Sequence, residues 1–170
     1  VCRTHGNVLL VDFDSLVPNL ALMKISAWHN LKGDNVTLQR GPKIADKFEK
    51  YDIAYISCIF SKNARAARRL AKVLSTSIKE VHLGGSGVNL KTTLPDKIEC
   101  MMPDYDLYPE CDYSMGFTTR GCIRKCPFCI VPVKEGSIRA VADIYQFWDR
   151  RHKKIVFLDN NIFALSEHFK

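Results

Sequence analysis

The chain has 170 residues, of which 46% are apolar and 25% are charged. This length suits one compact domain with a sizeable core, and the ordinary share of charge excludes a disordered chain. The net charge of +7 permits a polyanionic partner without requiring one. No window approaches the ~18 uninterrupted apolar residues of a membrane span, so we expect no membrane partner.

The start of the chain and its cysteines bear on the cellular compartment. The first residues lack the basic and apolar segments of a signal peptide. Val1 stands in place of an initiator Met, so we expect a processed or excised chain. The seven cysteines form an odd set, whereas a disulfide scaffold uses an even set in a short secreted chain. We therefore expect reduced thiols and a cytoplasmic location.

Strands alternate with helices along the first half of the chain. The apolar run at 8–13 (VLLVDF) is typical of a strand buried on both faces. Pro18 opens a helical pattern that Gly33 ends. Further strands are expected at 35–38, 52–58 and 80–83, with a short amphipathic helix at 43–50 and a helix at 64–74 capped by Asn63. The alternation predicts a doubly wound parallel sheet of about four or five strands.

The helix expected at 64–74 has a basic side, formed by Arg65, Arg68, Arg69 and Lys72. Such a side can contact phosphate or RNA, and it is also the usual composition of a solvated helix face. We interpret it as a solvated face, with an RNA contact as the alternative.

The sequence pattern changes between 91 and 109, a stretch that contains three prolines and no sustained periodicity of apolar residues. We place a linker there. A strand is then expected at 113–119, a loop at 120–136, a helix at 141–151 and a strand at 154–158. The sequence therefore predicts two units, 1–108 including the linker, and 109–170.

Three cysteines, Cys122, Cys126 and Cys129, lie in a C-x3-C-x2-C spacing within the loop. Thiolates that turn inward from one loop select zinc or an iron–sulfur cluster. A structural zinc site has four ligands, and Cys111 could be the fourth, so zinc remains open. Three cysteines on a four-iron cluster instead leave one iron for a small molecule.

The text TTRGC at 118–122 and CPFC at 126–129 resembles the signature of radical S-adenosylmethionine (SAM) enzymes. The resemblance implies that Cys122, Cys126 and Cys129 ligate a 4Fe-4S cluster whose fourth iron binds SAM. It also implies that Phe128 lies near the adenine, and that the loop follows the first strand of a (β/α) barrel. An electron donor such as flavodoxin or ferredoxin would be a partner.

The text FLDNNIF at 157–163 is similar to a motif at the end of the second barrel strand in that family, with Asn160 in place of a second acid. The resemblance implies that Asp159 faces SAM at the barrel mouth. A turn with Asx caps is the alternative.

The first unit looks like the cobalamin-binding-type domain that precedes some radical SAM barrels, with a double glycine at Gly84 and Gly85. The resemblance makes these glycines candidate cofactor-binding residues, and a plain backbone turn after a strand is the alternative. The D-x-H-x-x-G motif that supplies an axial His is absent. The fold can persist with or without the cofactor, so the resemblance leaves cobalamin open.

Together these features predict an α/β chain, with a Rossmann-like sheet followed by the first βαβ piece of a radical SAM barrel. A closed barrel needs ~200 residues or more and about sixty follow the linker, so we expect a fragment or a truncated relative with little SAM cleavage alone. The substrate and reaction outcome cannot be read. One alternative is a non-catalytic zinc or iron–sulfur module. Another is an RNA-modifying methylthiotransferase, whose extra cysteines would be Cys2, Cys58 and Cys100.

Overall fold

The computed structural model describes residues 5–43 and 48–165. The chain divides into two compact units, Val1–Leu107 and Tyr108–Lys170.

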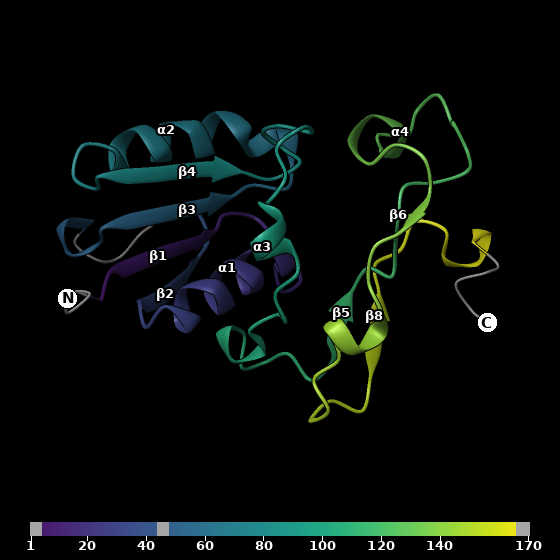
Figure 1. Cartoon of the computed structure of the whole chain (residues 1–170). Helices are drawn as coiled ribbons and strands as arrows, with labels where there is room; N and C mark the ends of the chain where they lie inside the picture. The colour runs from purple at the N-terminus through teal and green to yellow at the C-terminus, as the bar shows by residue number, and fades with distance from the viewer. Residues whose placement is uncertain (1–4, 44–47, 166–170) are drawn as a thin grey trace. The chain divides into compact units, whose positions relative to one another are not determined.

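The first unit is an α/β layer structure around a four-stranded parallel sheet (Figure 1). Its strands are β1 (Asn7–Asp12), β2 (Asn35–Arg40), β3 (Ile53–Ser57) and β4 (Glu80–Gly84). Its helices are α1 (Leu20–Leu31), α2 (Ala64–Leu74) and α3 (Asp96–Glu99). The sheet order is β2-β1-β3-β4, so the order reverses between β1 and β3. The α/β class and the parallel sheet are confirmed, and they are compatible with a Rossmann-like fold.

Alternate side chains of β1 enter two apolar clusters on opposite faces of the sheet. Leu9 and Val11 pack with α2 residues, whereas Val8 and Leu10 pack with α1 residues. This alternation follows from the period of two along a strand. It explains why residues 8–11 are all apolar, because both faces of β1 are buried.

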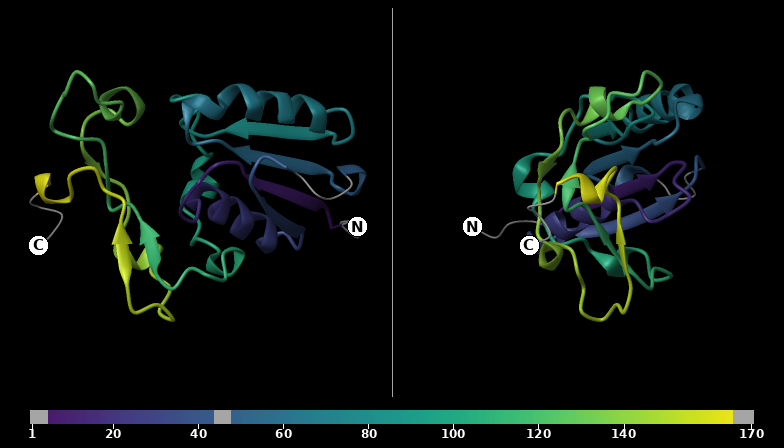
Figure 2. Two further views of the ribbon diagram at one scale, coloured as in Figure 1. Left: turned by 180° about the vertical axis from the view of Figure 1, so that it is seen from behind. Right: turned by 90° about the vertical axis from the view of Figure 1, so that its right-hand side faces the viewer.

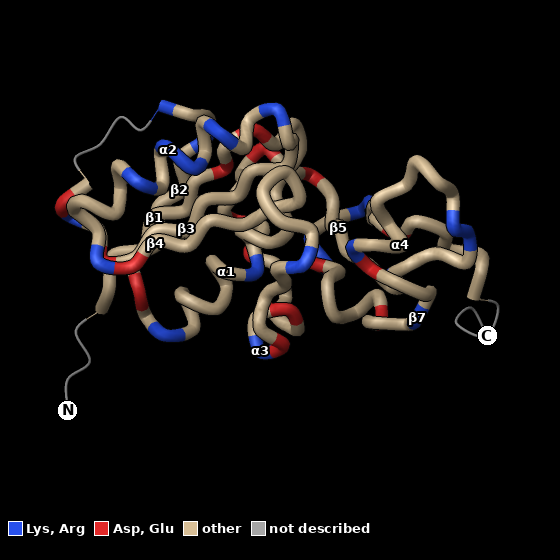
Figure 3. Tube along the Cα trace, turned by 90° about the horizontal axis from the view of Figure 1, so that it is seen from above, with Lys and Arg blue, Asp and Glu red and all other residues tan. Residues whose placement is uncertain are grey.

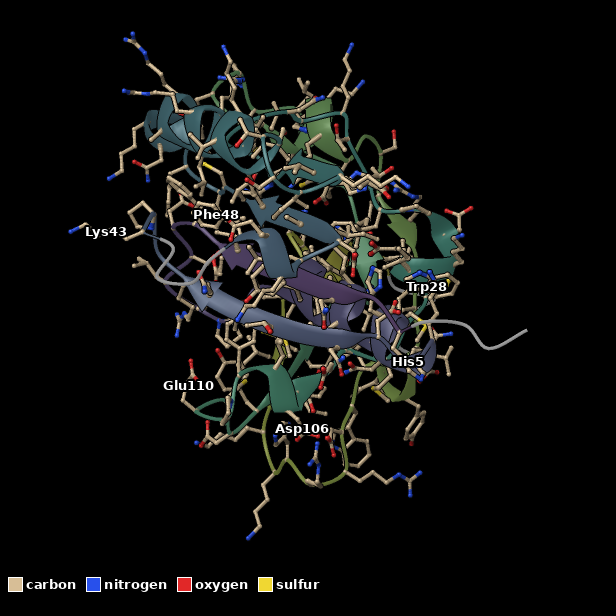
Figure 4. All side chains as sticks on the ribbon, turned by 90° about the vertical axis from the view of Figure 1, so that its left-hand side faces the viewer. His5, Trp28, Lys43, Phe48, Asp106 and Glu110 are labelled. Carbon is tan, nitrogen blue, oxygen red and sulfur yellow. The ribbon has the colours of Figure 1, made fainter. Side chains whose placement is uncertain are left out.

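Within 91–109, where a linker is expected, residues between Lys97 and Asp104 contact α1. Ile98 of α3 is buried in the same cluster as Leu22 and Ile25. Asp104 accepts hydrogen bonds from Ser26 and Asn30 of α1. Lys97 of α3 lies with its Nζ atom 4.9 Å from the centre of the Trp28 ring, which is labelled in Figure 4. The stretch up to Leu107 therefore belongs to the first unit.

Two further expectations in the first unit need correction. The start of α2 is as expected, but Asn63 makes no side-chain cap; its amide donates to Asp14 Oδ2 at 2.9 Å. The amphipathic helix expected at 43–50 lies partly outside the described residues, and its described end is one 3-10 turn, Phe48–Lys50.

The second unit contains two small strand pairs. Its strands are β5 (Ser114–Gly116), β6 (Thr119–Arg120), β7 (Arg139–Ala140) and β8 (Ile155–Phe157), and its single-turn helix is α4 (Val131–Lys134). β5 and β8 pair in parallel, as expected, and they run side by side in both views of Figure 2. β6 and β7 pair antiparallel.

The strand expected at 113–119 is broken into β5 and β6. The break occurs at Thr118, whose backbone N–H donates to the Asp159 carboxylate rather than to a neighbouring strand. A side-chain acceptor thus replaces the strand ladder at that point.

The prediction of a helix at 141–151 is wrong. Only a 3-10 turn forms, Ile144–Gln146, which Asp143 and Gln146 close with a capping box. The chain then turns away so that Phe147 packs on Gly116 of β5 and the Asp149 N–H donates to Ser114 Oγ at 2.9 Å. Tertiary contacts with β5 override the helical pattern of the sequence.

Candidate functional site

The cysteine loop connects β6 to β7 and follows the carboxyl end of β5. β8 runs parallel to β5, so the segment after β8 lies at the same edge of this strand pair. At this edge the residues before the cysteine loop meet Asp159, and Figure 1 shows the paired strands β5 and β8.

The three loop cysteines are half-buried and are not in disulfides. The Arg124 N–H lies 3.4 Å from Cys122 Sγ, and the Val131 N–H lies 3.5 Å from Cys129 Sγ. Cys129 N–H donates to the Cys126 carbonyl at 3.1 Å, which turns the end of the loop. Within residues 5–43 and 48–165, no three His, Cys, Asp or Glu side chains are gathered into a metal site. The loop carries the three thiols without converging their sulfurs.

The chemistry of this donor set fits a soft metal or an iron–sulfur cluster. Thiolate sulfurs bound to a cluster commonly accept backbone hydrogen bonds, and such N–H groups already lie beside two of the sulfurs. Arg124 and Lys125 are exposed on the same loop and would offset negative charge. Phe128 is 90% exposed, so its ring is open to a partner or ligand.

Asp159 follows β8, and residues that precede the cysteine loop bind its carboxylate. Thr118 donates from its hydroxyl to Oδ1 at 2.8 Å and from its backbone N–H to Oδ2 at 3.1 Å. Thr119 donates to Oδ1 from both its N–H and its hydroxyl. Burial raises the pKa of Asp159, but these hydrogen bonds outweigh burial and hold the pKa below its usual range. Asp159 thus joins the two strand ends at this edge.

Two residues at this edge were missed as site residues by the sequence analysis, Glu135 and Asn160. Glu135 accepts from Gly121 N–H at 3.1 Å and from the Asn160 amide at 2.8 Å. Arg120 lies 3.3 Å from the other carboxylate oxygen. The sequence signal for Glu135 was that it is the one acidic residue in the loop expected at 120–136, whose other charged residues are basic.

Cys111, the possible fourth zinc ligand, lies before β5, at the amino end of the strand. It is buried, and its thiol contacts the Tyr113 carbonyl at 3.1 Å. The cysteine loop follows the opposite, carboxyl end. This placement does not provide the four-cysteine set of a structural zinc site.

The cysteines of the first unit are not brought together either. Cys58 is buried at the end of β3, and burial, followed by the nearby Asp14, raises its pKa to about 11. Cys100 is exposed after α3, and Cys2 lies outside the described residues. A second cluster site of the methylthiotransferase kind therefore receives no support from Cys58 and Cys100.

The double glycine closes the loop after β4 onto the end of β3. Gly85 has a φ of +99°, and a Cβ atom there would lie 2.2 Å from the Cys58 carbonyl oxygen. Cys58 N–H also donates to the Gly84 carbonyl at 3.0 Å. The space beside Gly85 is filled by the chain itself, which explains Gly85 as a packing requirement.

The residues at this sheet edge do not fit a cobalamin with an axial histidine. Among the described residues, the loops after β1, β3 and β4 contain no histidine. His29 is engaged elsewhere, with Nδ1 2.7 Å from Asp34 and Nε2 3.1 Å from the Tyr55 hydroxyl.

Figure 3 marks Lys and Arg positions along α2 in blue, and the four residues of its basic side are exposed. Arg65, Arg69 and Lys72 project from it, while Arg68 reaches the Val88 carbonyl at 3.3 Å. Ala64, Ala67 and Leu74 form the buried side. This arrangement agrees with the interpretation of a solvated face on an amphipathic helix.

In comparisons with known proteins, no family model, no curated protein and no solved structure matches the chain. Across the described part of the chain, every helix is too short or too polar to cross a membrane.

Proposed function

We propose that the second unit holds a 4Fe-4S cluster through Cys122, Cys126 and Cys129, and that it serves a radical SAM enzyme. The observation that carries the proposal is the placement of three thiols, none in a disulfide, on one loop at the carboxyl end of a parallel strand pair. Active sites of parallel β/α folds gather at this end of the strands.

A three-thiol set supports the cluster over a structural zinc site. The fourth cysteine of the unit, Cys111, lies at the other end of β5. Three protein ligands leave one iron open, and that is where SAM would bind. When bound, the cluster would supply one electron to SAM and so start radical chemistry on a substrate.

The chain's own residues would bind and position. Phe128 offers an exposed ring on which an adenine can stack. Asp159 is occupied by Thr118 and Thr119, so we assign it the role of holding the loop rather than of binding SAM. Arg124 and Lys125 would favour an acidic electron donor such as flavodoxin or ferredoxin. Reduced thiols make the cytoplasm the expected compartment.

The test is anaerobic iron–sulfur reconstitution of the whole chain and of single Cys→Ala variants. Replacement of Cys122, Cys126 or Cys129 should remove most of the bound iron and the broad visible absorption of a cluster. Cys100→Ala is the matched control, since Cys100 is exposed in the first unit. Equal iron loss in the control, or stoichiometric zinc in place of iron, would contradict the proposal and favour a structural metal module.

SAM cleavage by the reconstituted chain under strong reductant is expected to be slight. The exposure of Phe128 leaves an adenine stacked there open to water, and catalysis of this kind needs a shielded site. Sustained multiple turnover would show that the described edge suffices for catalysis.

A further inference from the structure

The buried carboxylate of Glu135 has no role yet in the second unit, since it is neither a cysteine ligand nor part of the Asp159 contacts. Glu135 directly follows α4, and its side chain is only 8% exposed. Buried carboxylates persist where several donors compensate for the loss of water. The donors around Glu135 therefore show what this side chain holds in place.

The donors come from two segments that lie far from each other in the sequence, residues 120–121 and Asn160. Oε2 accepts from the Gly121 N–H at 3.1 Å and from the Asn160 side chain at 2.8 Å. Oε1 faces Arg120 Nη1 at 3.3 Å. The Arg120 guanidinium is itself fixed, because it lies 3.8 Å from the centre of the Phe117 ring. Glu135 thus contacts the start of the cysteine loop and the segment after β8.

The backbone around Glu135 closes the base of the loop at the same place. Cys122 N–H reaches the Gly136 carbonyl at 3.4 Å. Gly121 has a φ of +85°, and a Cβ atom there would lie 2.3 Å from the Ser137 carbonyl oxygen. The two stems of the loop are therefore in contact next to Cys122, whereas Arg124, Lys125 and Phe128 extend into solvent.

We propose that Glu135 is a positioning residue for the cysteine loop, which fixes Gly121, and through it Cys122, against the segment after β8. The inference rests on the proposed cluster-binding function of the loop. It adds that the three cysteines are unequal: Cys122 is pre-positioned by the Glu135 contacts, and Cys126 and Cys129 are ordered mainly by the metal. Prior ordering of a ligand lowers the entropy cost of metal binding.

The first test uses the metal-free chain and measures the alkylation rate of each cysteine by mass spectrometry. Glu135→Ala should speed alkylation of Cys122 several-fold and leave Cys126 and Cys129 within twofold of the unchanged chain. The buried Cys111 reports general loosening of the unit. An unchanged rate at Cys122, or an equal rise at Cys111, would overturn the proposal.

A conservative variant separates positioning from general folding. Glu135→Gln keeps an oxygen for Gly121 and Asn160 but places an amide group opposite Arg120. It should raise the Cys122 rate less than Glu135→Ala does. Asn160→Ala should give an intermediate rate, and Glu110→Gln, an exposed acid of the same unit, should match the unchanged chain. A Gln variant as fast as the Ala variant would contradict the assigned contacts.

Iron reconstitution then links the contact to the cluster. Glu135→Ala should retain several-fold less iron than the unchanged chain, with a shifted electron paramagnetic resonance spectrum after reduction. If Cys122→Ala loses iron while Glu135→Ala retains it with the same spectrum, the positioning role is wrong and the proposed function stands. If Cys122→Ala keeps its iron, the proposed function fails, and the alkylation rates alone decide the role of Glu135.

Discussion

Different interactions stabilise the interior of each of the two units. The first unit buries apolar residues on both faces of β1, in two clusters that include α1 and α2. The second unit has only short strand pairs. Hydrogen bonds to the carboxylates of Asp159 and Glu135 join segments of this unit that are distant in sequence. Apolar burial tolerates small shifts, whereas carboxylate contacts specify particular atoms. Contacts of the second kind would suit a unit that positions metal ligands, as we propose for the second unit.

The largest effect should come from shortening a core side chain of the first unit. Leu9→Ala removes a fully buried side chain of β1 and should cost about 2–5 kcal/mol of unfolding free energy. Val156→Ala in β8 is the counterpart in the second unit, where the side chain is 41% exposed. It should cost less than about 1 kcal/mol. Denaturant titration followed by circular dichroism measures both, and equal losses would remove the contrast between the units.

The next effect concerns the carboxylate that joins β8 to the cysteine loop. Asp159→Ala leaves the Thr118 and Thr119 donors without their acceptor and should cost about 1–3 kcal/mol. Asp112→Ala is the matched control, because Asp112 pairs with Lys154 while both side chains are 70% exposed. The control should change the unfolding free energy far less, because water and salt screen an exposed ion pair. Limited proteolysis between residues 118 and 160 locates the loss, and similar cleavage of the two variants would argue against the role of Asp159.

A smaller effect is expected on the pH dependence of the unfolding free energy, and it too tests the role of Asp159. The folded-state pKa of Asp159 lies below its usual range, so the unfolded chain binds the proton more readily. The stabilisation is fully present above the usual range of an aspartate and is lost as the pH falls through the lowered pKa. Asp159→Ala should remove part of the acid-induced loss seen by the near-ultraviolet signal of Trp148, a residue of the second unit. An identical acid profile in the variant would contradict this assignment.

The smallest effect is expected at the basic side of α2. Replacement of Arg65 and Arg69 by Gln should change unfolding free energy by less than about 0.5 kcal/mol, since both side chains are exposed. RNA titration at physiological salt should show weak, salt-sensitive binding at most, with or without these changes. Tight, salt-resistant binding that these changes abolish would favour an RNA contact instead.

The first unit was predictable because its local patterns agree with its tertiary contacts. The apolar run at 8–13 became β1, and the helical spacing before Gly33 became α1. The role of Asn63 was not predictable, because its partner Asp14 lies 49 residues earlier and becomes a neighbour only when β1 and β3 pair.

In the second unit, distant contacts override local patterns. The apolar spacing of 141–151 suits a helix, but Phe147 and Asp149 are held by β5. The cysteine spacing identified the loop from the sequence alone. The partners of Glu135 could not be inferred, because Gly121 and Asn160 lie 14 and 25 residues from it in opposite directions.

The close approach of Gly85 to Cys58 has a consequence for how the double glycine is used as a signature. Of the two glycines, Gly84 has open space where a Cβ atom would lie, whereas Gly85 is confined by the backbone of Cys58. Substitution should therefore be tolerated at the first position and rejected at the second, regardless of any cofactor. A sequence motif based on this glycine pair would therefore identify chains whose loops pack closely at the sheet edge. Other residues would have to show whether such chains share a chemistry.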